Sequence, residues 1–170
     1  MAYRVEDLKS GQVILELPDG QAPWTQRLLD WAIMKSSGPF AHALMVGNGE
    51  LIEQLAHCQT SPLDKYVQTG WVYTIAGLTP DKAQGMIAWA KARIGEPYGY
   101  WAILQDGLML DGKDWDMLHV DPKYPTCSGF VERAARIGGG ISLTEMPLPS
   151  PTALAFSPLL IGPRPWSVHA

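Results

Sequence analysis

The cysteine at position 127 is the residue in this sequence best placed to act as a nucleophile. Thr126 precedes it, and apolar residues at helical spacing follow until the glycines at 138–140. Because Thr is a favourable N-cap, the pattern predicts a helix that holds Cys127 in its first turn. The unpaired N–H groups and the dipole at a helix start favour a thiolate, and the same N–H groups could bind an oxyanion.

The alternative for Cys127 is an ordinary place in the core, since a lone cysteine is usually a small buried residue. The next residues, Ser128 and Gly129, are small and would let a substrate approach closely, which favours the chemical role and makes Ser128 a candidate substrate contact. Cys58 is the other cysteine. Two cysteines in a chain of this size form no disulfide framework, so free thiols are expected.

His42 and Glu53 are predicted to lie on one face of a hairpin. Apolar runs at 41–46 and 51–55 flank Asn48-Gly49, the strongest short hairpin signal. If Asn48-Gly49 forms the turn, Glu53 lies diagonally across from His42, with about 7–8 Å between the backbones. Glu53 could then orient the imidazole and stabilise its protonated form. The hairpin alone is equally compatible with two side chains that do not cooperate, and His57 remains an alternative third residue.

Other candidate site residues carry weaker signals. Tyr98, Tyr100 and Tyr124 lie in segments rich in Gly and Pro, where side chains commonly line a cleft, and they are predicted to contact substrate. His57 beside Cys58 resembles part of a metal site, but no second cluster with ligand spacing accompanies it. We therefore predict no metal and no organic cofactor.

The remaining elements predict a mixed α and β domain. Residues 12–17 and 71–75 have the pattern of buried strands, and 24–35 that of an amphipathic helix. Thr79 and Pro80 indicate the start of a helix that reaches about residue 94. The segment from about residue 101 to Pro125 has no pattern that predicts a helix or a strand. The proline-rich tail from Pro147 is expected to be loop with short helix or strand pieces. One domain over 1–170 is predicted.

Charge and hydropathy limit the partners. The net charge of −4 and the absence of a basic run argue against nucleic acid. No stretch reaches the roughly 18 apolar residues of a membrane helix, and the N-terminus has no secretory layout. We expect a cytoplasmic protein when synthesised, although virion association or release by lysis is compatible with the same sequence. The sequence does not specify an oligomeric state.

Three motifs resemble the NlpC-type cell-wall peptidases. The family's nucleophile motif Asp-Cys-Ser-Gly-Phe-Val is similar to 126–131, and its Gly-x-Pro-Tyr is similar to 95–98. Its base strand, with His, apolar residues, Gly-Asn-Gly and a second strand, resembles 42–53. Here the His strand precedes the Cys helix. That order resembles the permuted branch, which includes YiiX-like hydrolases and, more distantly, lecithin retinol acyltransferase.

The resemblance spans about residues 8 to 158, since Gly11-Gln12 and 151–158 are similar to motifs at the two ends of the permuted branch. Two positions depart from the pattern: Thr126 stands where the family often has Asp, and Gln12 where it has Asp. The resemblance implies an α+β fold of the circularly permuted papain-like (NlpC-type) class. In that fold a Cys-bearing helix packs on a small antiparallel sheet that presents His42 and Glu53.

The implied activity is that of a cysteine hydrolase, with Cys127, His42 and Glu53 forming an acyl-enzyme. A first hypothesis is cleavage of an amide bond, in a peptidoglycan stem peptide or another peptide or isopeptide. A second is a lipid ester or thioester acyl hydrolase or acyltransferase with the same triad. A third is a catalytically silent binding or virion-structural module, although such a module has no need for all three side chains. The sequence does not choose the substrate, peptide or acyl lipid, nor decide between hydrolase and transferase.

Overall fold

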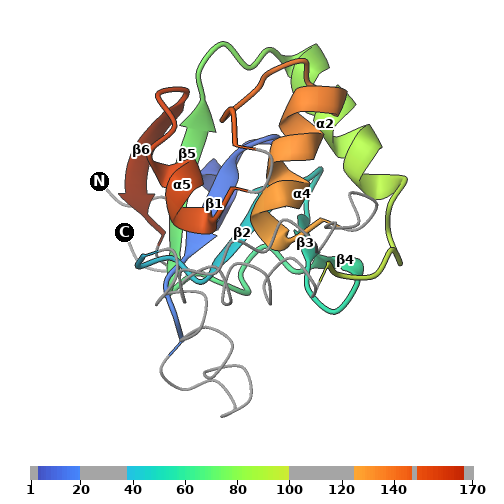
Figure 1. Cartoon of the computed structure of the whole chain (residues 1–170). Helices are drawn as coiled ribbons and strands as arrows, with labels where there is room; N and C mark the ends of the chain where they lie inside the picture. The colour runs from blue at the N-terminus through green and yellow to red at the C-terminus, as the bar shows by residue number, and fades with distance from the viewer. Residues whose placement is uncertain (1–3, 20–37, 100–124, 147–148, 167–170) are drawn as a thin grey trace, which may run out of the picture.

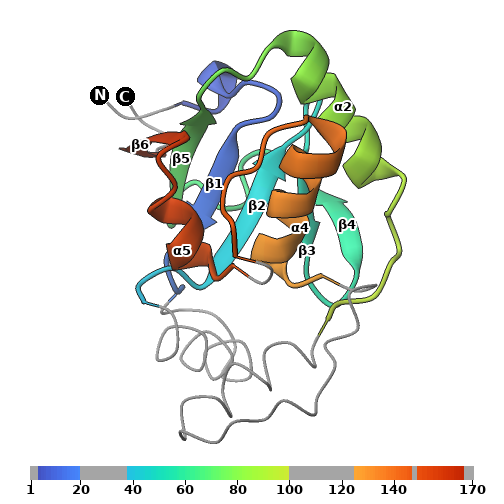
Figure 2. The same cartoon turned by 45° about the horizontal axis from the view of Figure 1, so that its top comes forward.

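The computed structural model describes residues 4–19, 38–99, 125–146 and 149–166. Their framework is a six-stranded sheet in which every neighbouring pair is antiparallel (Figures 1 and 2). The strand order is β4-β3-β2-β1-β5-β6, so the central pair is β1 and β2. The strands are β1 (Val13–Glu16), β2 (His42–Val46), β3 (Leu51–Gln54), β4 (Cys58–Ser61), β5 (Gly70–Ile75) and β6 (Leu160–Pro165).

Helices cover one face of this sheet (Figure 2). The helix α4 (Cys127–Arg133) packs against β2 and β3 and continues into the π-helical turn η2 (Ala134–Gly138), which packs against α2 (Pro80–Lys91). Close contact between α2 and η2 depends on glycine, because a Cβ on Gly85 would lie 2.2 Å from the Gly138 carbonyl oxygen. The short elements are η1 (Val5–Asp7) and α5 (Pro151–Ala155).

Both faces of the sheet are buried, since alternate strand residues belong to two apolar clusters. Val13, Ala43 and Met45 pack under the helices, in the larger cluster. Ile14 and Leu44 point the other way, into a smaller cluster that also contains Tyr66. His42 is two residues from Leu44, and Glu53 pairs with Leu44, so His42 and Glu53 lie on the face of the smaller cluster.

Most predicted elements in the described residues are present. The strands expected at 12–17 and 71–75 correspond to β1 and β5, and Thr79 caps α2 by accepting a hydrogen bond from the Lys82 N–H at 3.4 Å. The hairpin predicted around Asn48-Gly49 is confirmed, since Val46 pairs with Leu51 and Leu44 pairs with Glu53. The helix predicted at 24–35 lies outside the described residues.

Two strands were not predicted individually. The strand β4 has the polar sequence Cys-Gln-Thr-Ser, which carries no alternating pattern, and β6 contains prolines that only an edge strand tolerates. The tail prediction of short pieces agrees with α5 and β6. Among the described helices, none has the length and apolar character needed to cross a membrane.

Candidate active site

The start of α4 presents Cys127 as its first helical residue. Thr126 is the N-cap, and its hydroxyl accepts a hydrogen bond from the Gly129 N–H at 3.2 Å, as the sequence predicted. Cys127 is 2 % exposed, and both cysteines of the described residues are free thiols. In Figure 2 the start of α4 and the start of β2 lie at the same end of the sheet. The first residue of β2 is His42, so the histidine and the cysteine meet at this end.

His42 and Glu53 form a buried pair across the β2–β3 hairpin. Leu44 pairs with Glu53 in the sheet, which makes His42 the diagonal neighbour of Glu53 on one face. The His42 Nε2 and the Glu53 Oε2 are 3.1 Å apart, and the two residues are 6 % and 0 % exposed. This contact takes Nε2, so Nδ1 is the ring nitrogen left for Cys127. The structure thus brings together the three side chains predicted to act as a triad.

The charged forms of Cys127 and His42 stabilise each other. Burial alone lowers the pKa of His42, but a hydrogen bond and charge interaction with Cys127, and then with Glu53, outweigh burial and raise that pKa to about 10. Burial raises the pKa of the Cys127 thiol, whereas His42, the Ala43 N–H and the Tyr98 hydroxyl lower it, and the net direction is down. Both shifts favour a thiolate beside an imidazolium.

Five donors surround the Glu53 carboxylate. Its Oε2 accepts from His42 and from the Tyr66 hydroxyl at 2.5 Å. Its Oε1 accepts from the Lys65 ammonium at 2.6 Å, from the Gln59 amide at 3.3 Å and from the Ser61 hydroxyl. Burial raises the pKa of Glu53, but His42, Lys65 and Ser61 outweigh burial and hold that pKa well below its usual range. Glu53 is therefore a carboxylate throughout the neutral pH range.

Tyr98 lies against the nucleophile. Its hydroxyl is 3.8 Å from the Cys127 Sγ and accepts from the Cys127 N–H at 3.4 Å. The segment that carries Tyr98 is anchored by the buried Gln54, whose amide donates to the carbonyls of Glu96 at 3.2 Å and Pro97 at 2.9 Å. Tyr98 therefore lies beside Cys127, while its predicted place in a cleft and its contact with substrate stay predictions.

The remaining candidates have different surroundings. Ser128 is buried, and its hydroxyl donates to the Pro149 carbonyl at 2.5 Å, so this side chain makes a structural contact and its substrate role stays a prediction. His57 is exposed and forms a backbone bridge with Pro97, whereas the described partner of His42 is Glu53. Tyr100 and Tyr124 lie outside the described residues. In the part of the chain that the structure describes, no group of three or more His, Cys, Asp or Glu side chains is placed to hold a metal ion.

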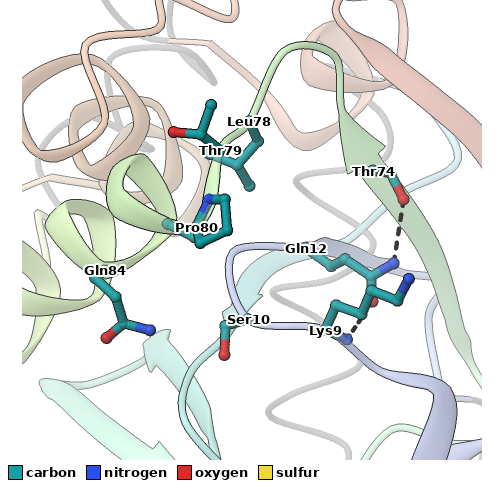
Figure 3. Close-up of a pocket in the computed structure, with 9 residues that line it drawn as sticks. Lys9, Ser10, Gln12, Thr74, Leu78, Thr79, Pro80 and Gln84 are labelled. Carbon is teal, nitrogen blue, oxygen red and sulfur yellow. Dashed lines mark hydrogen bonds between the residues drawn. The ribbon is translucent and has the colours of Figure 1, made fainter.

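A cavity of about 370 Å³ lies elsewhere, between the chain before β1 and the start of α2 (Figure 3). Gln12 lines this cavity. The Gln12 Oε1 accepts a hydrogen bond from the Lys9 N–H, and the Gln12 Nε2 donates one to the Thr74 hydroxyl. His42 pairs with Glu16 at the other end of β1, so this cavity is separate from Cys127. These contacts give Gln12, at the position where the resembled family has Asp, a structural role.

Sequence reasoning missed the donors to Glu53. Ser61 and Gln59 come from β4, which had not been recognised as a strand, and Lys65 and Tyr66 follow it in the chain. The pairing of Glu53 with Gln59 in the β3–β4 register brings β4 beside the carboxylate. Recognising β4 as a strand would have indicated these donors, because polar residues on the strand next to a buried glutamate are suitable hydrogen-bond partners for its carboxylate.

No protein-family model matches the chain, and no curated protein matches it. The fold is similar to the crystal structure of the metalloprotein yiiX from Escherichia coli O157:H7, a DUF1105 protein. The two align with a TM-score of 0.63 and 15 % sequence identity over 89 % of this chain and 94 % of that chain. Identity this low establishes the shared fold alone. The chain therefore has a YiiX-like α+β fold.

Proposed function

We propose that this protein is a cysteine hydrolase in which Cys127 attacks the carbonyl carbon of an amide substrate. The observation that carries the proposal is the buried chain of contacts from Cys127 through His42 to Glu53. A structural core has no need to bury a thiol, an imidazole and a carboxylate in contact, because each charged form costs free energy to desolvate.

The reaction follows from the order of these contacts. The Cys127 thiolate forms a bond to the carbonyl carbon, and the Cys127 N–H, which donates to the Tyr98 hydroxyl in the free enzyme, turns to the substrate and stabilises the oxyanion. The His42 imidazolium gives its proton to the leaving amine as the C–N bond breaks. Neutral His42 then takes a proton from water, whose oxygen attacks the acyl carbon; the C–S bond breaks, and a carboxylic acid leaves while Cys127 returns to the thiolate beside the His42 imidazolium. Glu53 holds the imidazole and stabilises its charged form.

The chain order of the site supports a permuted papain-like fold. The strand that carries His42 precedes the helix that carries Cys127 in the chain. The two residues meet because α4 packs against β2 and both elements begin at the same end of the sheet (Figure 2). Sequence motifs resemble the NlpC-type peptidases in this permuted order, which favours an amide bond in a peptide, such as a peptidoglycan stem peptide, as the substrate.

The yiiX protein is described as a metalloprotein, so we tested whether the residues here fit a metal ion. Glu53 directs both of its oxygens at five donors, which leaves Cys127 and His42 as the ligating groups that the described residues bring to the site. Two ligands are fewer than the three or four protein ligands of a zinc site. The donor set that the described residues place at Cys127 does not fit a resident metal.

Trapping the acyl-enzyme tests this function. Incubation with peptidoglycan stem peptides, acyl-lipids and acyl thioesters in parallel, followed by intact-mass measurement, should give an acyl adduct on wild type and none on Cys127→Ala. The adduct's mass identifies the substrate class: a peptidyl adduct supports the amide hydrolase, and an adduct from the lipid or thioester arms alone favours the acyl hydrolase or acyltransferase. Hydrolysis by Cys127→Ala at the wild-type rate would refute the assignment of Cys127 as the nucleophile.

A further inference from the structure

The buried charges around Cys127 balance only when Lys65 is counted with them. A thiolate, an imidazolium and a carboxylate together carry one net negative charge. Cys127, His42 and Glu53 are 2 %, 6 % and 0 % exposed, so this negative charge lies where water cannot solvate it well. An uncompensated charge in such a place makes protonation of the whole group easier.

The Lys65 ammonium supplies the missing positive charge. Its Nζ lies 2.6 Å from the Glu53 Oε1, on the opposite oxygen from the one that contacts His42. The Lys65 side chain is 33 % exposed, so its ammonium can keep contact with water while its stem packs inward. With Lys65 the cluster of four groups is neutral.

Other groups near the cluster do not replace this charge. Tyr66, Ser61 and Gln59 are neutral donors to Glu53, and Tyr98 is a neutral contact of Cys127. The charge of Glu53 also acts on Cys58, and the charges of Glu16 and Cys127 act on Tyr66. Cys58, Tyr66, Glu16 and Cys127 are neutral or negative, so none of them supplies a positive charge. Among the described groups that face Glu53, Lys65 is the cation besides His42.

We propose that Lys65 is a positioning residue for the reaction: it holds Glu53 as a carboxylate aimed at His42 and neutralises the charge of the buried thiolate, imidazolium and carboxylate. The inference rests on the proposed function and adds a fourth residue to its machinery. Lys65 touches neither Cys127 nor the reacting atoms in this arrangement, because it acts through Glu53.

The test is the pH dependence of Cys127 alkylation by iodoacetamide, followed by mass mapping of the Cys127 peptide. Lys65→Met should move the midpoint of the alkylation curve upward by about half to one pH unit, less than the shift of one to three units that a directly paired charge produces. The direction is upward because loss of a positive charge makes it easier for Cys127 to keep its proton. Lys65→Arg keeps the charge and should restore most of the wild-type midpoint.

Two controls separate charge from packing. Lys82→Met removes a positive charge from the exposed first turn of α2 and should leave the midpoint in place. Tyr66→Phe removes a neutral donor to the same carboxylate, so it should move the midpoint much less than Lys65→Met does. Urea unfolding of each variant checks that the fold is retained.

The outcomes distinguish this inference from the proposed function. If Lys65→Met leaves the midpoint unchanged, or moves it no more than Lys82→Met or Tyr66→Phe, the role of Lys65 is refuted while the Cys127 nucleophile stands. If wild-type Cys127 alkylates with the midpoint of an ordinary thiol, the thiolate–imidazolium pair fails, and the proposed mechanism fails with it.

Discussion

Cys58 and Cys127 are both buried and free, yet their surroundings give the two thiols opposite chemistry. Cys58 lies in β4 with its Sγ near the Ala90 carbonyl, and burial raises the pKa of its thiol to about 11. Cys127 lies beside His42, whose hydrogen bond and positive charge, together with the Ala43 N–H and the Tyr98 hydroxyl, outweigh burial and lower the Cys127 pKa. Burial alone therefore does not decide the reactivity of a cysteine, since the partner of the thiol does.

Iodoacetamide should accordingly modify Cys127 much faster than Cys58 at pH 7. An unperturbed thiol is only a few per cent thiolate at that pH, and the raised pKa of Cys58 makes its fraction smaller still. Peptide mass mapping after brief labelling measures both rates in one sample. Labelling of Cys58 first, or at an equal rate, would show that the environment of Cys127 does not activate its thiol.

The helix start at α4 is the element on which the site depends. Thr126 accepts from the Gly129 N–H, which satisfies one of the unpaired donors of the first turn and fixes where the helix begins. Because Cys127 is the next residue, the same hydrogen bond sets the position of the Sγ relative to the end of β2. Thr126 stands where the NlpC-type peptidases that the sequence resembles often have Asp, and it keeps the cap without adding a carboxylate beside Cys127.

We expect Thr126→Ala to lower the free energy of unfolding by about 1 kcal/mol, the usual cost of losing an N-cap. Thr126→Ser retains a hydroxyl that can accept from Gly129 and should lose much less. Urea unfolding at neutral pH measures both variants against wild type. Equal losses in the two would mean that the threonine methyl group, and not the hydrogen bond, stabilises this helix start.

At the scale of the whole molecule, the sheet gathers segments that are distant in the chain. The hairpin β2–β3 holds His42 and Glu53, β4 and the residues after it surround Glu53, and α4 brings Cys127 to the end of β2. The buried charge of Glu53 is thus linked to the stability of the entire fold, because unfolding exposes its carboxylate to water and separates it from its partners.

This linkage predicts how stability depends on pH. The folded pKa of Glu53 lies below its ordinary value of 4.5, so its stabilisation is present above pH 4.5 and is lost as the pH falls from there toward the folded pKa. Gln is the uncharged isostere of protonated Glu. Wild type should therefore be more stable than Glu53→Gln at pH 7, and the difference should narrow as the pH falls below about 4.5.

Urea unfolding of both proteins at several pH values between 7 and 3 measures this difference. Because His42 contacts Glu53, the titration of His42 near its ordinary pKa of 6.5 also differs between the two proteins, so the change in the gap below pH 4.5 is the part that reports on Glu53. A gap of constant size across this range would contradict a depressed pKa for the Glu53 carboxylate.

The sequence determined those features that depend on local pattern. Asn48-Gly49 between apolar runs specifies the hairpin and its register, which in turn places Glu53 diagonally from His42. Thr126 before an apolar helix specifies where α4 begins, and so where Cys127 stands in it. Each of these follows from turn and capping preferences that act over a few residues.

Only the tertiary structure decided which charges meet. The contacts of Lys65, Ser61 and Tyr66 with Glu53 depend on β4, a short polar strand that pairs because β3 offers it a free edge and not because its own residues favour a strand. Likewise, Cys127 reaches His42 because α4 packs across β2, a contact between residues 85 positions apart whose formation no local propensity encodes. Polar partners of a buried charge are selected by proximity in the folded chain, and proximity is a property of packing.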